Sequence, residues 1–256
     1  MNNSELQDLQ MAGVLWELDD TPMVLRNAEN ITSTPDVQPN APQLSRTQTS
    51  IVPPIAPTHQ MSPDTAAAMA ARPTDINSLQ RMIAEFCHPL RSGATNVVLA
   101  HIAPEPNGMV IITDVPGADD DASGRILSGA TGELLDKMLN AIGMSRENVS
   151  LVPLVFWRTP GGRTPTRDEL DLARPFVNRI LEFLNPQLIL TLGAVAASEI
   201  GNISLPHGHG VAITHTSGAH LIPIFHPNYL ILKPAAKRDV WNALQSAQNL
   251  LKNADE

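Results

Sequence analysis

Cysteine is nearly absent from this sequence, because Cys87 is the only one in 256 residues. A single thiol excludes an intramolecular disulfide and any metal or iron–sulfur site built from cysteines alone. Apolar runs are also short: none approaches the roughly 20 residues of a membrane-spanning helix, and no basic stretch is followed by a long apolar core. We therefore expect a cytoplasmic protein without a signal peptide and without a membrane segment.

The chain also lacks an excess of basic residues. Its net charge is −9, of which residues 1–75 carry −6 and residues 76–256 carry −3. This balance excludes a uniformly basic surface of the kind that binds nucleic acid without sequence preference, so any contact with DNA has to come from a local surface. Neither GxGxxG nor GxxxxGK occurs, which weakens the case for an enzyme that binds a nucleotide cofactor.

The N-terminal third shows little periodic apolar pattern. From Asp36 to Pro73 the residues are mostly Pro, Thr, Gln, Ser, Asn and Ala, which cannot bury enough apolar surface to offset the entropy of ordering. Residues 4–20 have apolar side chains near helical spacing and predict a short helix, which either docks on a partner protein or has no function. We expect a mostly disordered region over 1–75 and a folded domain over 76–256.

Within the folded domain, apolar runs alternate with amphipathic helical patterns. The longest helical pattern begins with a capping box of Thr166 and Glu169. Strands separated by helices predict an α/β fold, a three-layer α/β/α sandwich with a central, mostly parallel sheet. The predicted strands lie within the runs 108–117, 148–158, 187–193 and 220–231, and the predicted helices cover 74–86, 129–143, 166–186, 194–201 and 234–252.

Three predicted strands end in unusual loops, at 114–117, 153–162 and 226–229. Ligands of such folds bind beyond the carboxyl ends of the strands, so we expect these loops to line one cleft. Pro153 is expected at a strand end or on an edge strand, because proline removes a donor from the hydrogen-bond ladder.

Polar residues near these loops have structural explanations when each is taken alone. Asp114 and His226 favour a turn-capping aspartate and a strand-end histidine. The aspartates at 119–121 are consecutive and cannot all point inward, so a solvated loop that caps the following turn is favoured over a metal site. No metal is expected at the histidines either, because they lack metal-ligand spacing and a neighbouring cysteine. These histidines are His207, His209, His215 and His220.

Two basic groups flank the expected cleft. They either grip phosphates at its mouth or form a solvated face of mixed charge, and the sequence favours neither. The first group consists of Arg158, Arg163 and Arg167, and the second of Lys233, Lys237 and Arg238.

Five segments, which follow one another in the same order as in a known family, resemble that family. They are TDVPGADDDASGR, GATGELLDKMLNAIG, RTPGGRTPTRDEL, ARPFVNRILEFLNPQLILTLGAVAA and FHPNYLILKPAAKRDVWNAL. Together they resemble the uracil-DNA glycosylase superfamily, and most of all its iron–sulfur family 4 of bacteria and archaea, over residues 78–250. The resemblance implies the fold predicted above, DNA as partner, and hydrolysis of the N-glycosidic bond of uracil or another damaged base.

The chemistry explains which residues the resemblance selects. Breaking the bond leaves an oxocarbenium-like sugar and an anionic base, so a carboxylate and a hydrogen-bond donor each face developing charge. The resemblance assigns these roles to Asp114 and His226. The base must also leave the stack and enter a pocket. By resemblance the pocket holds Val115, Pro116, Gly117, Leu127 and Pro153, and the DNA contacts are Arg158, Arg163, Pro227, Asn228, Tyr229 and Lys233.

The sequence departs from the family pattern at three of these positions and at the residue before Asp114. Leu127 stands where the family has an aromatic ring that stacks on the base, and Pro153 where it has an asparagine that reads uracil. Asp114 replaces a glutamate, and Thr113 before it replaces a glycine. Proline has no side-chain amide, so it cannot discriminate between uracil and other bases as that asparagine does.

The cluster ligands of family 4 are also changed. Cys87 matches one of its four cysteines, while Trp157 and Ala173 fall where two others would lie. We therefore expect no iron–sulfur cluster, and apolar packing in its place.

The sequence is compatible with three functions. The first is a monomeric, cofactor-free uracil-type DNA glycosylase. The second is a catalytically degenerate relative that binds DNA, or a repair or replication partner, without releasing a base. The third and weakest is a small-molecule α/β enzyme that uses the same cleft.

Overall fold

The computed structural model describes residues 61–254. The predicted helix over 4–20, and the predicted linker as far as residue 60, lie outside these residues. A five-stranded sheet forms the centre, with the strand order β2-β1-β3-β5-β4. All neighbours pair in parallel except β4 and β5. The strands are β1 (Met109–Thr113), β2 (Ser150–Pro153), β3 (Leu188–Leu192), β4 (Ile213–Thr214) and β5 (His220–Ile224).

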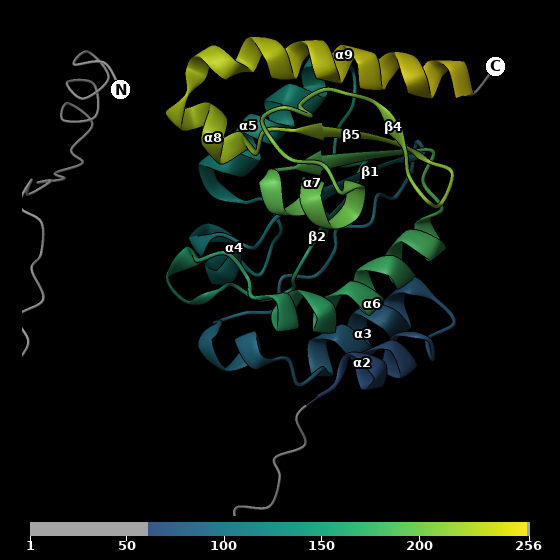
Figure 1. Ribbon diagram of the computed structural model, residues 1–256, viewed down its shortest axis with the longest axis vertical. Coiled ribbons are helices and arrows are strands. Elements are labelled where there is room, and N and C mark those ends of the chain that lie inside the picture. The colour runs from purple at the N-terminus through teal and green to yellow at the C-terminus, as the bar shows by residue number, and fades with distance from the viewer. Residues whose placement is uncertain (1–60, 255–256) are drawn as a thin grey trace, which may run out of the picture. The chain divides into compact units, whose positions relative to one another are not determined.

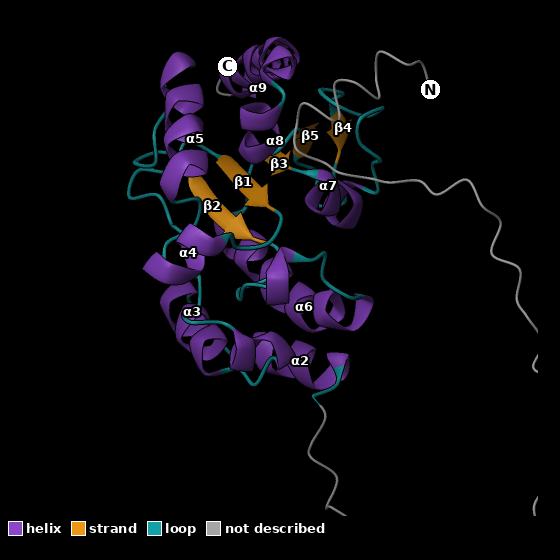
Figure 2. Ribbon diagram, turned by 90° about the vertical axis from the view of Figure 1, so that its left-hand side faces the viewer, coloured by secondary structure: helices purple, strands orange, loops and turns teal. Residues whose placement is uncertain are grey.

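Helices cover both faces of this sheet (Figures 1 and 2). On one face, α5 (Gly129–Ala141) and α9 (Lys237–Ala254) enclose one apolar core, and on the other α6 (Arg167–Leu184) and α7 (Ala194–Gly201) enclose a second. This arrangement confirms the predicted three-layer α/β/α fold. The remaining α-helices are α2 (Pro63–Ala70), α3 (Ile76–Glu85), α4 (Ala118–Ser123) and α8 (Pro227–Leu232), and short 3-10 turns cover Pro89–Gly93, Pro160–Gly162 and Pro234–Ala236.

The helix α2 corrects the sequence-based domain boundary. Ser62 caps its first turn through the Thr65 N–H, and Pro63 occupies the first helical position. Ala66 and Ala70 are buried against the layer that contains α6 (Figure 2). The prediction of a disordered linker is therefore wrong over α2, and the folded part begins before residue 76. The alanines counted in that disorder-prone composition are strong helix formers whose small side chains allow close packing.

The four parallel strands end level with one another. Thr113 of β1 pairs with both Pro153 and Leu192, and Leu192 pairs with Ile224 of β5. Pro153 is the last residue of the edge strand β2, where the sequence placed it. The loops that follow these four residues consequently start from one edge of the sheet.

The capping box predicted for the longest central helix is present. The Thr166 hydroxyl accepts from the Glu169 N–H, and the Glu169 carboxylate accepts from the Thr166 N–H. Asn185 closes α6 in a left-handed conformation. Across residues 61–254, every helix is too short or too polar to span a membrane.

Candidate active site

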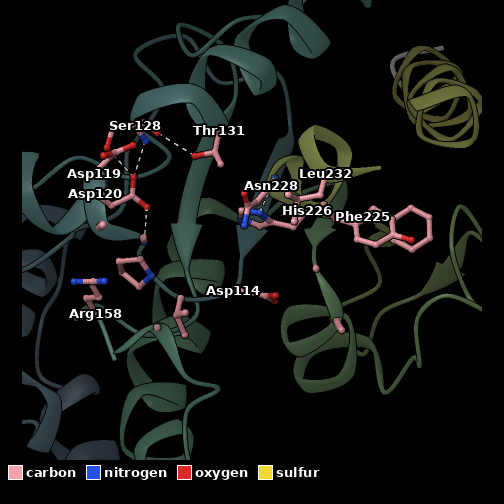
Figure 3. Close-up of a pocket in the computed structure, with 18 of the residues that line it drawn as sticks. Asp114, Asp119, Asp120, Ser128, Thr131, Arg158, Phe225, His226, Asn228 and Leu232 are labelled. Atoms are coloured by element: carbon pink, nitrogen blue, oxygen red, sulfur yellow. Dashed lines mark hydrogen bonds between the residues drawn. The ribbon is translucent and has the colours of Figure 1, made fainter. Parts of the chain in front are cut away.

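A cleft of about 760 Å³ opens at the carboxyl edge of the sheet (Figure 3). The loops after β1 and β5 both contribute to it, as the sequence predicted. Of the predicted site residues, the cleft is lined by Asp114, Val115, Pro116, Gly117, Arg158, His226, Asn228 and Tyr229.

Asp114 follows β1 and is held by the first turn of α7. Its Oδ1 accepts a hydrogen bond of 2.6 Å from the Ala196 N–H. Gly193 precedes this turn with a φ of +104°, and a Cβ at Gly193 would collide with the Asp114 carboxylate. Burial raises the pKa of Asp114 to about 6, although the N–H groups of Ala196 and Val195 lower it. The carboxylate therefore caps α7 and faces the cleft.

His226 follows β5 and is the N-cap of α8. Its Nδ1 accepts from the Asn228 N–H at 3.2 Å, and its Nε2 lies 3.1 Å from the Thr113 Oγ1. Because Nδ1 accepts, the neutral ring carries its proton on Nε2 and donates to Thr113. Burial lowers the pKa of His226 to about 4, against the opposing charge of Asp120. The imidazole is therefore neutral at pH 7.

The prediction of a solvated loop at the aspartates 119–121 is wrong. Residues 119–121 lie in α4, and Asp120 and Asp121 are only 5% and 6% exposed. Asp120 accepts from the N–H groups of Gly117 and Ser128, at 2.9 and 2.6 Å. Asp121 accepts from the Thr95 N–H at 2.8 Å. Two of the three carboxylates thus hold loops together rather than facing water, while Asp119 is exposed and lines the cleft.

The two arginines predicted to contact DNA have different surroundings. Arg158 lines the cleft, and Figure 3 shows it on the same side as Asp120. Arg163 does not line it. Its guanidinium donates to both carboxylate oxygens of Glu169, at 2.8 and 2.6 Å, and this bond lowers the pKa of Glu169 to about 2. Arg163 therefore holds its loop against the start of α6 instead of facing the cleft.

Two residues predicted in the base pocket lie outside the cleft. Leu127 is 2% exposed within the core beneath α5 and α9, and its φ of +49° accompanies this inward position. Pro153 is buried at the end of β2. In this structure both side chains are used in packing and neither lines the cleft. Pro227 is likewise buried, and Lys233 is exposed beyond the cleft lining.

Phe225 was missed by the sequence reasoning, and with Tyr229, which was predicted, it forms an aromatic wall of the cleft. Phe225 lines the cleft, and its ring centroid lies 4.8 Å from Tyr229 and 4.2 Å from His209. Tyr229 is 43% exposed, and Leu232 beside it is 70% exposed. Figure 3 shows Phe225 and Leu232 across the cleft from Arg158. The available signal was position, because Phe225 directly precedes the histidine–proline pair.

The resemblance to family 4 implies an iron–sulfur cluster, and the side chains at its ligand positions do not fit one. Cys87 is exposed. Trp157 and Ala173 are buried, and the Trp157 ring stacks on His88 at 4.9 Å. In the part of the chain that the structure describes, no group of three or more His, Cys, Asp or Glu side chains could hold a metal ion. Aromatic packing occupies the region where the ligands would lie.

The protein is therefore a three-layer α/β protein whose parallel strands end level with one another. Its cleft contains a carboxylate that follows β1 and a histidine–proline turn that follows β5. The sequence profile of the Uracil DNA glycosylase superfamily matches residues 99–245. The chain therefore belongs to the uracil-DNA glycosylase superfamily.

Two similar proteins carry the name of one branch of this superfamily. The type-4 uracil-DNA glycosylase of Thermotoga maritima is 32% identical over 169 residues, which cover 64% of this chain and 88% of the relative. The type-4 enzyme of Archaeoglobus fulgidus is 30% identical over 147 residues, which cover 54% of this chain and 74% of the relative. The chain thus resembles family 4, as the sequence motifs predicted.

Proposed function

We propose that this protein is a DNA N-glycosylase that releases uracil or another damaged base. The observation that carries this proposal is that Asp114 and His226 reach one cleft from the ends of β1 and β5. A carboxylate and a neutral donor on one cleft match the two charges that develop as a glycosidic bond breaks. The family membership and the type-4 relatives support the same chemistry.

In this mechanism the target nucleotide turns out of the stack into the cleft. Asp114, ionised above pH 6, orients the attacking water and stabilises the cationic sugar. His226, neutral at pH 7, stabilises the departing base as a hydrogen-bond donor when its Nε2 proton leaves Thr113 and turns to the cleft. His226 therefore does not need to be protonated to its cationic form in this mechanism.

The reaction is proposed to need no cofactor. Its two charge-stabilising groups are side chains of this chain, and the ligand positions of the family cluster hold Trp157 and Ala173 in apolar packing.

A second candidate function is DNA binding without base release. The hydrogen bonds of the site favour it, because His226 uses both ring nitrogens and Asp114 uses one oxygen inside the protein. In addition, Pro153 cannot supply the amide that reads uracil. Binding would then rest on Arg158 and on the aromatic wall.

Incubation with labelled DNA separates these functions. Purified protein is mixed with a duplex that carries one U:G pair, and separately with single-stranded uracil DNA, and abasic sites are then cleaved with alkali. The glycosylase proposal expects cleavage that Asp114→Asn and His226→Ala abolish. His220→Ala, an exposed histidine at the far end of β5, is the control. DNA retardation on a gel without cleavage supports the binding function, and cleavage unchanged in both cleft variants contradicts the proposed roles.

A further inference from the structure

The Thr113 hydroxyl accepts a hydrogen bond from the only ring N–H of neutral His226. Thr113 is the last residue of β1, immediately before Asp114, and it is 2% exposed. Its Oγ1 is 3.1 Å from the His226 Nε2, although β1 and β5 are separated by β3. The contact therefore joins the two loops that carry the proposed chemistry.

The tautomer of His226 follows from its other nitrogen. The Asn228 N–H can only donate, so Nδ1 has to accept, and the neutral ring has one proton left, on Nε2. That proton is directed at Thr113, which is not among the residues that line the cleft. The imidazole borders the cleft, but its donor points into the protein.

This geometry matters because a donor accelerates bond cleavage only if it faces the charge that develops. A proton held by Thr113 cannot at the same time stabilise a departing base. We propose that Thr113 is a positioning residue that withholds the His226 proton from the cleft and so restrains base release. The restraint on release rests on the proposed glycosylase function, whereas the withheld proton does not.

A neighbouring threonine provides the matched comparison. Thr191 lies on β3 beside β1, pairs with Ile112, and is fully buried. Its Oγ1 has no hydrogen-bond partner among the described residues. Thr191→Val therefore makes the same chemical change in the same sheet without removing a hydrogen bond of His226.

The withheld proton is tested by histidine side-chain nitrogen NMR on the full-length protein. In the wild type and in Thr113→Ser, the His226 signals should match an Nε2-protonated ring whose proton exchanges slowly with water. Thr113→Val keeps the volume and removes the acceptor, and it should accelerate this exchange at least about tenfold. Thr191→Val should leave the signals unchanged. Equal exchange in the wild type and Thr113→Val would overturn the proposal, and Thr113→Ala repeats the test if the valine variant does not fold.

The restraint is tested by base release from the U:G duplex. Removing one transition-state donor commonly costs a factor of about 100 to 1,000, so a freed donor should raise release by roughly tenfold to a hundredfold. Thr113→Val should show this gain, Thr113→Ser and Thr191→Val should not, and the double variant Thr113→Val/His226→Ala should lose it. Release that falls or stays constant in Thr113→Val overturns the restraint. No release from any variant, together with the expected NMR change, rejects the proposed function and keeps the positioning of His226.

Discussion

Asp114 accepts a hydrogen bond from the Ala196 N–H, so the carboxylate that faces the cleft is also the cap of α7. One side chain thus joins the proposed chemistry to the stability of a helix. Mutations at this position will change both, and experiments on Asp114 have to separate them. Asparagine retains an oxygen that can accept from Ala196, which makes Asp114→Asn the informative substitution.

The first prediction concerns the pH dependence of stability. The pKa of Asp114 is raised from 3.8 to about 6 by burial, so the folded state binds more protons than the unfolded state in this interval. The contribution of Asp114 to the free energy of unfolding should therefore fall by about 2–3 kcal/mol as the pH rises from 4 to 7, while His226, whose pKa is lowered, contributes in the opposite direction. In Asp114→Asn this contribution should disappear. Urea unfolding at several pH values measures it, and identical pH profiles of the two proteins would contradict the raised pKa.

The second prediction concerns the pH dependence of base release. If ionised Asp114 acts on water and sugar, the rate should rise about tenfold per pH unit below 6 and level off above 7. The pKa of His226, lowered to about 4, should add no further step between pH 5 and 8. Single-turnover release from the U:G duplex measures the profile. A rate that falls between pH 5 and 7 would show that the protonated carboxyl is the active form.

The third prediction concerns the approach of Asp114 to α7. Gly193→Ala adds a methyl group that collides with the carboxylate at a φ of +104°. We expect a loss of about 2 kcal/mol or more in the free energy of unfolding, together with loss of base release. Gly218→Ala is the matched control, because Gly218 has a φ of +91° and no atom within 4 Å of an added Cβ. Equal losses in the two variants would mean that backbone strain alone, and not the carboxylate, sets the cost.

The fourth prediction separates the two arginines. Arg158→Ala should weaken DNA binding with little effect on stability, since Arg158 lines the cleft. Arg163→Ala should lower the unfolding temperature, because Glu169, which is 7% exposed, then loses its partner. Fluorescence anisotropy at two salt concentrations and thermal unfolding measure the two effects. The fourth prediction fails if Arg163→Ala weakens DNA binding and leaves the unfolding temperature unchanged.

The fifth prediction concerns the region of the family cluster. Trp157→Ala should destabilise the protein by about 3–5 kcal/mol, whereas Cys87→Ser should have almost no effect, because Cys87 is exposed. Protein purified without oxygen should contain no stoichiometric iron. Iron that copurifies with the wild type and is lost in Cys87→Ser would contradict the proposed absence of the cluster.

The fold was predictable because its signals are local. The capping box at Thr166 and Glu169 marked a helix start, and proline at 153 marked an edge strand. The helix α2 was missed although Ser62 and Pro63 form an ordinary helix start, since composition was averaged over a long segment. A local signal was thus present and was outweighed by its surroundings.

The site was less predictable because side-chain direction depends on packing. The resemblance aligned Leu127 with a pocket residue, but a positive φ turns it into the core. The expectation of a solvated loop at 119–121 failed because Asp120 and Asp121 point to two different loops, although Asp119 is exposed as that argument required. The bond between Thr113 and His226 joins positions 113 residues apart, and no spacing in the sequence indicates it.

The two walls of the cleft differ in character. Asp119, Asp120 and Arg158 lie on one wall, and Phe225 and Leu232 on the opposite one (Figure 3). The planar ring of a base has a polar edge and two apolar faces. Only one orientation of the base places its polar edge on the polar wall and an apolar face on the apolar wall. The two different walls therefore fix the orientation of a bound base. We expect a nucleotide in the reversed orientation to be excluded, because its polar edge would face the apolar wall.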